Sequence, residues 1–300
     1  MSNEWRLDTY LQDRVQLLES ALDAYLPDKE TLPARLHEAM RYSVFAGGKR
    51  IRPVLMMAAC EAVGGDPQTV LPAACAIEMI HSYSLIHDDL PSMDDDDFRR
   101  GQPTSHKVYG EAQAILAGDA LLTEAFILLS NPDVWGAVPV ERQREAIHLL
   151  ARSSGSRGMV GGQVVDMQSE GQEVDLPTLE YIHTHKTGAL ILAAIETGAI
   201  LAGAGQIQQR ALCRYGEAAG LAFQVADDIL DIVANQEQLG KDVGSDLQRG
   251  KVTYPALLGL DGARERAREL RNLAFSALHD FGESARPLRE IASYIVDRSF

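Results

Sequence analysis

Two aspartate-rich segments contain the residue types and spacings in this chain that are best suited to chemistry. One runs from Asp88 to Asp94 and the other from Asp227 to Asp231, and both lie in apolar stretches with helical periodicity. Crowded carboxylates repel one another unless a cation binds them, and their hard oxygen atoms suit magnesium better than zinc. Magnesium held by few carboxylates takes further ligands from water and phosphate. The segments therefore predict two walls of one magnesium site that binds a diphosphate.

The spacing of the aspartates predicts how each segment presents its side chains. Asp227 and Asp231 are four residues apart, so on a continuous helix they lie one above the other. Asp228 points about 100° away from Asp227 and is expected to be a supporting or alternative ligand. In the first segment Pro91 cannot continue a helix, which predicts a helix end near Asp89 and a loop that returns Asp94 to Asp88. A solvated acidic run is the ordinary explanation for one such cluster, but it does not explain two beside apolar helix faces.

Basic residues occur where an anion site needs them. The stretch 47–53 combines a glycine turn with Lys49, Arg50 and Arg52 just before a helix, so backbone amides and all three cations could face a phosphate. It lacks the spacing of a nucleotide-binding P-loop. Arg99 and Arg100 follow the first acidic segment and could either pair with the aspartates at 95–97 or contact phosphate oxygens. Further candidates are Lys186, Thr187, Gln224, Lys241 and Lys251.

His81 lies seven residues before Asp88, and therefore on the same helical face. A lone histidine there is more often a core residue than a ligand, but beside a diphosphate pocket it could donate to a second substrate. His87, His183 and His185 show no metal-binding spacing with cysteine, and no chemistry is assigned to them.

Composition restricts the class of protein. The chain has 300 residues, 46% of them apolar, with a net charge of −15, which disfavours nucleic-acid and anionic-membrane binding. The three cysteines are widely spaced and are expected to be reduced core thiols. Without an evident secretory signal, we expect a cytoplasmic protein. The apolar segment 187–205 contains Glu196, so we interpret it as a buried helix and expect no stable membrane insertion.

Apolar periodicity and scarce β-branched alternation predict an all-α protein. Glycine and proline breaks divide the chain into about ten helices without a long linker. We therefore expect one domain over residues 1–300, a helical bundle that encloses a deep apolar cavity with both aspartate motifs at its mouth.

Together these motifs resemble the trans-prenyltransferase (polyprenyl synthase) family, and most closely bacterial farnesyl diphosphate synthases. The resemblance extends over about residues 30 to 270 in matching order. In addition to the two aspartate motifs, its specific parts are 47–53, Arg99-Arg100-Gly101, Gly162-Gln163, Lys186-Thr187, Phe223-Gln224, Gly250-Lys251 and Thr253-Tyr254-Pro255.

The resemblance implies the isoprenoid synthase fold, a homodimer and a role for each motif. It implies that three magnesium ions are held by Asp88, Asp94, Asp227 and Asp231, with Asp89 and Asp228 in support. The other implied partners of an allylic diphosphate are Arg99, Lys186, Thr187, Gln224 and Lys241, with Lys251 as a further substrate-binding residue. Isopentenyl diphosphate would bind Lys49, Arg52, His81 and Arg100.

Product length depends on the pocket below Asp88. Ser84 lies one turn before Asp88 and only about 40° around the helix, whereas Tyr83 is further round, so spacing alone does not show which side chain closes the pocket. In the resembling enzymes, a bulky aromatic five residues before the first aspartate, together with the longer aspartate loop present here, accompanies a farnesyl product. The resemblance therefore implies farnesyl diphosphate, with geranylgeranyl diphosphate as the alternative.

Two other classes compete with this interpretation. A terpene cyclase also ionises a prenyl diphosphate with acidic helices and magnesium, but it would not need a second cationic site such as Lys49, Arg52 and Arg100. A non-catalytic subunit of a heteromeric synthase could lose its aspartates, whereas both motifs are complete here.

Overall fold

The computed structural model describes residues 5–237 and 252–297 and confirms the predicted all-α fold. In those ranges the only strands are β1 (Phe98–Arg99) and β2 (Gln102–Pro103), which form one antiparallel pair. The chain divides into two compact units. Unit 1 comprises Met1–Met57 and Pro67–Ile147, and unit 2 comprises Ala58–Asp66 and His148–Phe300. The expectation of a single domain with a central cavity stays a prediction.

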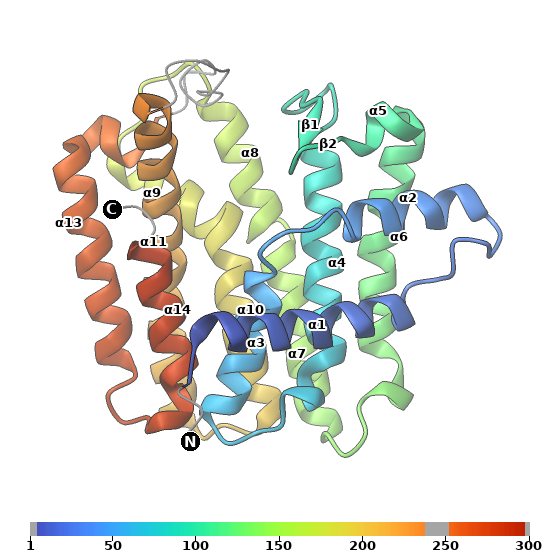
Figure 1. The fold of residues 1–300 in the computed structure, drawn as a ribbon, viewed down its shortest axis with the longest axis horizontal. Coiled ribbons are helices and arrows are strands. Elements are labelled where there is room, and N and C mark those ends of the chain that lie inside the picture. Colours follow the sequence, from blue (N-terminus) through green and yellow to red (C-terminus); the bar gives the residue numbers. More distant parts are fainter. Residues whose placement is uncertain (1–4, 238–251, 298–300) are drawn as a thin grey trace. The chain divides into compact units, whose positions relative to one another are not determined.

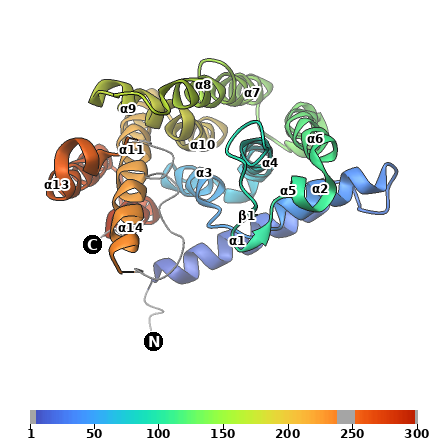
Figure 2. The same ribbon diagram turned by 90° about the horizontal axis from the view of Figure 1, so that it is seen from above.

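Unit 1 is built around a helix that is buried on almost every side. This helix, α4 (Leu71–Asp88), packs against α6 (Glu111–Ser130) and also contacts α1 (Leu7–Tyr25) and α2 (Ala34–Val44) (Figures 1 and 2). Its apolar residues surround the helix instead of forming one stripe, as expected for a central core helix. The remaining elements of the unit are η1 (Pro67–Val70), α5 (Ser105–Tyr109) and η2 (Pro132–Val134). Helices α3 (Ile51–Ala62) and α7 (Val140–Ser154) begin in unit 1 and end in unit 2.

Unit 2 is organised along the long helix α11 (Gln206–Glu237). It packs against α10 (Ala189–Ala202), α13 (Tyr254–Ala277) and α14 (Arg286–Asp297) (Figure 1). Most side chains of α10 are buried, which confirms the interpretation of the apolar segment 187–205 as an internal helix. The remaining elements of the unit are α8 (Met159–Ser169), α9 (Leu176–Ile182), η3 (His183–Gly188) and η4 (Glu283–Ala285).

Two stretches of the described chain are long and apolar enough to cross a membrane, namely Pro67–Asp88 and Glu111–Ser130. In the first, 72% of the most apolar window is buried inside the protein, as for a core helix, whereas in the second the share is 39%. The outer face of α6 therefore carries apolar side chains that unit 1 does not cover.

Candidate active site

The first aspartate motif has the predicted helix end and loop. Helix α4 ends at Asp88, and the following turn contains Pro91. The backbone N–H of Asp94 donates to the carbonyl oxygen of Asp88 at 2.8 Å, so the loop returns Asp94 to the helix end. The prediction for this backbone is confirmed. Asp88 and Asp94 are both partly exposed, as residues that bind an ion and a substrate must be.

Asp89 is oriented differently from its neighbours. Its side chain is buried, and Oδ1 accepts from Arg99 Nε at 2.6 Å and lies 2.5 Å from Nη2. Arg99 Nη2 also lies 3.6 Å from Asp96. Burial outweighs the arginine and raises the pKa of Asp89. The observed role of Asp89 is therefore to hold Arg99 beside the loop that carries Asp94.

Arg100 is positioned by a short hairpin, which was not expected from the sequence. Residues Arg100 and Gly101 form the two-residue turn between β1 and β2 with φ of 55° and 77°, the backbone of a type I′ turn. The Arg100 guanidinium donates to the carbonyl oxygen of Gly47. A Cβ on Gly48 would lie 2.5 Å from that guanidinium, so the glycine leaves the space that Arg100 occupies.

The expectation that three cations of the stretch 47–53 face a phosphate is wrong for Arg50. Its side chain is buried, donating to Glu78 Oε1 at 2.7 Å and to the carbonyl oxygen of Val44 at 2.6 Å. Glu78 is equally buried. Removing either partner of an ion pair at this depth would leave the other charge buried without compensation. Arg50 therefore anchors the turn, whereas Lys49 is exposed and Arg52 is partly exposed.

His81 lies on α4 within electrostatic reach of several arginines. Burial, followed by the charges of Arg52, Arg100, Arg99 and Arg50, holds the pKa of His81 well below its ordinary value. The imidazole is therefore neutral at neutral pH, and it can donate a hydrogen bond without adding charge. Three residues with a predicted role in one anion site, Arg52, His81 and Arg100, are thus electrostatically coupled within unit 1.

The two candidate pocket residues on α4 have different surroundings. Tyr83 is buried, and its ring meets the His87 ring edge-on at 5.7 Å between centroids. His87 in turn lies close to the carbonyl oxygen of Ile115 on α6, at 3.1 Å. Ser84 donates to the carbonyl oxygen of His81 at 2.8 Å. Tyr83 therefore lies on the α4 face that packs toward α6, and its control of product length stays a prediction.

The second aspartate motif lies in unit 2 on an uninterrupted stretch of α11. Asp227 and Asp231 are thus one helical turn apart, as the spacing predicted. Asp228 accepts from His183 Nε2 at 3.1 Å and from the backbone N–H of Tyr254 at 2.8 Å. These bonds connect α11 to η3 and to the start of α13. Asp228 thus has a supporting position, and its partner His183 could not be identified from the spacing of the motif.

Tyr254 extends this network. Its ring stacks on that of His183 with centroids 5.6 Å apart, and its hydroxyl donates to Glu180 Oε1 at 3.0 Å. Arg266 Nη2 donates to the same carboxylate oxygen at 3.2 Å. Side chains from α9, η3, α11 and α13 are therefore joined around the helix that carries the second motif.

Lys186 and Thr187 lie in η3, a π-helical segment between α9 and α10. Such segments are rare and often occur at functional sites because the wider turn changes where side chains point. Lys186 Nζ donates to Asp166 Oδ2 on α8 at 2.7 Å. Thr187 is partly exposed, as is Gln224 on α11 one turn before the second motif.

Gly162 allows α8 to approach η3 closely. A Cβ there would lie 2.7 Å from the backbone carbonyl carbon of His185 and closer still to the amide nitrogen of Lys186.

We expect Gly162→Ala to lower the free energy of unfolding by about 1–3 kcal/mol through overpacking. Urea denaturation followed by circular dichroism measures this change. The matched control is Gly220→Ala on α11, where the new Cβ would meet its nearest neighbour at 3.5 Å and stability should not fall. Equal stability of both variants would contradict the close approach.

Two predicted substrate-binding residues, Lys241 and Lys251, lie outside the described residues. The two aspartate motifs belong to different units, so their joint binding of one diphosphate stays a prediction. Each motif taken alone offers several carboxylates close together in the sequence, and carboxylate oxygens are ligands that suit magnesium.

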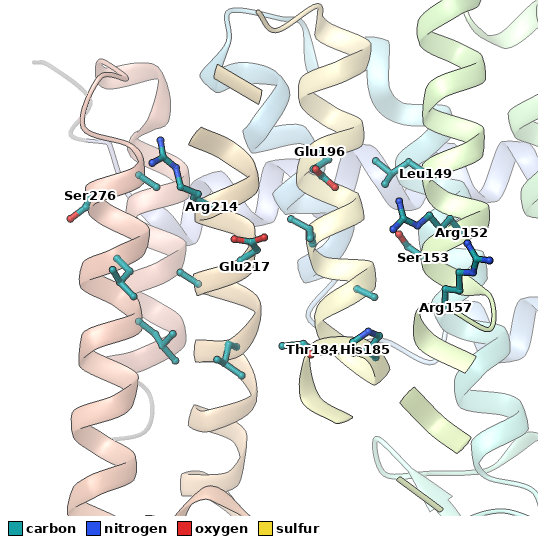
Figure 3. A pocket seen from close by; sticks show the side chains of 17 residues that line it. Leu149, Arg152, Ser153, Arg157, Thr184, His185, Glu196, Arg214, Glu217 and Ser276 are labelled. Carbon is teal, nitrogen blue, oxygen red and sulfur yellow. Dashed lines mark hydrogen bonds between the residues drawn. The ribbon is translucent and has the colours of Figure 1, made fainter. Parts of the chain in front are cut away.

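Unit 2 also contains a groove of about 850 Å³ (Figure 3). Its walls come from α7, η3, α10, α11 and α13, with Arg152, Arg157 and Glu196 among the lining residues. None of the predicted site residues within the described part of the chain lines it. Its mixed charge gives no preference for a diphosphate.

Comparisons with known proteins extend over almost the whole chain. Residues 33–284 match the polyprenyl synthetase family. A farnesyl diphosphate synthase of Geobacillus stearothermophilus is 53% identical over 260 residues, covering 87% of both chains. The large subunit 1 of a heterodimeric geranylgeranyl pyrophosphate synthase from Arabidopsis thaliana is 48% identical over 294 residues, covering 97% of this chain and 79% of that protein.

The fold agrees with this relationship. The crystal structure of an FPP/GFPP synthase from Zymomonas mobilis superimposes with a TM-score of 0.87 at 42% identity, covering 97% of this chain and 99% of the other. The relatives differ in the products that their names state. From the aspartate motifs, the helical fold and these matches, we conclude that the chain belongs to the polyprenyl synthetase family.

Proposed function

We propose that the protein is a prenyltransferase that condenses isopentenyl diphosphate with dimethylallyl and then geranyl diphosphate to give farnesyl diphosphate. The observation that carries the proposal is that unit 1 contains both an acidic motif and a separate cationic group. The loop returns Asp94 to Asp88, while burial and the positive charges of Arg52 and Arg100 lower the pKa of His81. A reaction between two diphosphates needs both features, whereas a terpene cyclase ionises one diphosphate and needs only the first.

The residues of the chain account for the steps of this reaction. Magnesium bound by the aspartates would supply the charge that stabilises pyrophosphate as it leaves. Lys186 and Arg99 would orient the allylic diphosphate and neutralise its oxygens. Arg52, Arg100 and the N–H of His81 would hold isopentenyl diphosphate so that its alkene attacks the allylic carbon. The condensed cation then loses a proton to the departed pyrophosphate, so no basic side chain is required.

The decisive experiment incubates purified protein with magnesium, isopentenyl diphosphate and either dimethylallyl or geranyl diphosphate. The products are dephosphorylated, and the alcohols are sized by chromatography. We expect a C15 alcohol, and no product after chelation of divalent ions. A C20 alcohol would identify the alternative, a geranylgeranyl diphosphate synthase. Hydrocarbon formed without isopentenyl diphosphate would identify a cyclase.

Tyr83→Ala is expected to lengthen the main product beyond C15, because it removes the bulky buried ring in the helix below Asp88. The measured quantity is the ratio of product lengths, which does not depend on how much of the variant is folded. Tyr25→Ala, on α1, removes a tyrosine from a different helix of unit 1 and should leave the ratio unchanged. An unchanged C15 product from Tyr83→Ala would exclude Tyr83 as the pocket floor.

We also infer that the protein is a cytoplasmic homodimer. The outer face of α6 exposes Ile115, Leu116 and Ile127 by 43%, 54% and 54%, and a second copy could cover this apolar surface. Cys60 and Cys75 are buried and form no disulfide, which suits a reducing compartment. Sedimentation equilibrium of the purified chain tests the dimer, and a monomer at micromolar concentration would exclude it.

A further inference from the structure

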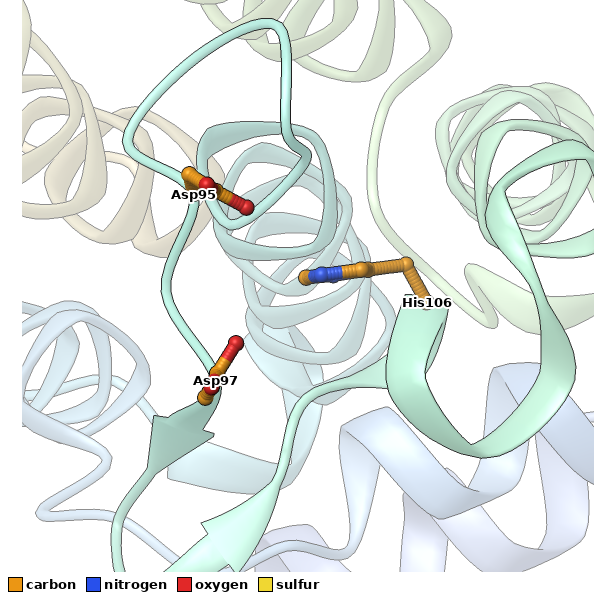
Figure 4. Close-up of side chains that lie close together, drawn as sticks. All are labelled: Asp95, Asp97 and His106. Carbon is orange, nitrogen blue, oxygen red and sulfur yellow. The ribbon is translucent and has the colours of Figure 1, made fainter.

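Three side chains outside the two aspartate motifs converge in unit 1. Asp95 and Asp97 precede β1, and His106 lies in α5. One potential ligand atom from each residue lies within 4.8 Å of the other two. Figure 4 shows the imidazole of His106 extending toward the space between the two aspartates. The two aspartates are exposed, whereas His106 is only 6% exposed.

A hydrogen bond sets the tautomer of His106. The Thr104 hydroxyl donates its single proton to a backbone carbonyl, that of Asp96 at 2.8 Å. The same hydroxyl oxygen lies 3.2 Å from His106 Nδ1 and must therefore accept a proton from this nitrogen. With Nδ1 donating to this hydroxyl, Nε2 is the ring nitrogen that can bind a metal. This is how a neighbouring oxygen prepares a histidine to bind a metal.

The Nε2 atom of His106 is buried and has no hydrogen-bond partner in the protein. A buried polar atom in this state typically costs about 1–3 kcal/mol, and a bound ligand would offset this cost. The ligand must accept a lone pair from nitrogen and tolerate two adjacent carboxylates, which a cation does and an anion does not. Asp97 already attracts one cationic group, because Nζ of Lys107 lies 2.6 Å from Asp97 Oδ1.

We propose that Asp95, Asp97 and His106 bind one divalent transition-metal ion, of the class of Zn²⁺, Co²⁺ or Mn²⁺. An imidazole nitrogen combined with carboxylate oxygens favours these ions over magnesium, which prefers oxygen ligands alone. The ion would join the segment before β1 to α5, and so fix the loop that continues from Asp94. The proposal goes beyond the prenyltransferase activity, and its test does not depend on turnover.

The test is equilibrium dialysis of the full-length, metal-stripped protein against Zn²⁺ in millimolar Mg²⁺, which occupies sites made of oxygen alone. We expect one tightly bound Zn²⁺ per chain, and at least about tenfold weaker binding in His106→Gln. Lys107→Ala should strengthen binding about two- to fivefold, because it removes a competing ammonium group. The control Lys29→Ala, at an exposed position, should bind as the parent does.

Spectroscopy identifies the ligand atom. Electron spin echo measurements on the Mn²⁺ form should show coupling to an imidazole nitrogen that His106→Gln loses and His87→Gln keeps. If His106→Gln fails to fold, Asp97→Asn and Lys107→Ala decide the question, because they should shift Zn²⁺ affinity in opposite directions. Unchanged Zn²⁺ binding in both of these surface variants, or an unchanged nitrogen signal in folded His106→Gln, would overturn the proposal.

Discussion

Asp88→Asn is expected to lower kcat for condensation by about 10²- to 10³-fold while leaving the protein folded. A loss of this size in kcat is typical when one group of a preorganised electrostatic site is removed. The amide keeps the shape of the carboxylate but removes the negative charge that would hold magnesium at the end of α4. Asp88 is partly exposed, so the exchange should not disturb the core. Steady-state kinetics with isopentenyl and geranyl diphosphate measures the loss.

The magnesium requirement distinguishes loss of a metal ligand from a general disturbance of the structure. Asp88→Asn should require more magnesium for half-maximal activity than the parent, because its weaker site fills only at higher concentration. Asp261→Asn, a fully exposed change on α13, removes the same charge elsewhere and should change neither kcat nor the magnesium requirement. Near-parental kcat for Asp88→Asn would remove Asp88 from the proposed metal site.

Arg50→Met is expected to lower the free energy of unfolding by about 3–5 kcal/mol, the cost of leaving one partner of a buried ion pair. The substitution leaves the Glu78 carboxylate, which is 2% exposed, without its guanidinium partner. It also removes the donor to the carbonyl oxygen of Val44. Urea denaturation monitored by circular dichroism gives the change in stability.

The double variant Arg50→Met with Glu78→Leu tests the cause. Because it removes both charges, it should recover much of the lost stability, since apolar pairs often replace buried ion pairs without penalty. Arg6→Met is the surface control, because Arg6 pairs with Asp8 at 3.5 Å with both side chains at least 70% exposed, and it should cost at most about 1 kcal/mol. A double variant as unstable as Arg50→Met would show that the ion pair is not the cause.

Features that depend on neighbouring residues could be predicted from the sequence. Pro91 blocks the helix, and the structure accordingly ends α4 at Asp88 and returns Asp94 to it by a backbone hydrogen bond. Asp227 and Asp231 are one turn apart because α11 is continuous. The rules of helix periodicity act over a few residues, so they apply before any tertiary contact forms. The family resemblance could also be identified from the sequence, because each of its motifs is a contiguous stretch of residues.

The direction in which charged side chains turn was decided only by the tertiary structure. Arg50 lies between Lys49 and Ile51 in a stretch that suggested an anion site, but its buried partner Glu78 is 28 residues away. Likewise, His183 reaches Asp228 over 45 residues, and Arg100 reaches Gly47 over 53.

The sequence by itself thus determined the helices, the aspartate motifs and the family. The tertiary structure decided which cations are buried, which carboxylates are already paired, and that His106 meets Asp95 and Asp97. The physical reason is that a charge is stabilised by whichever partner lies within a few ångströms after folding, and no local spacing encodes that partner.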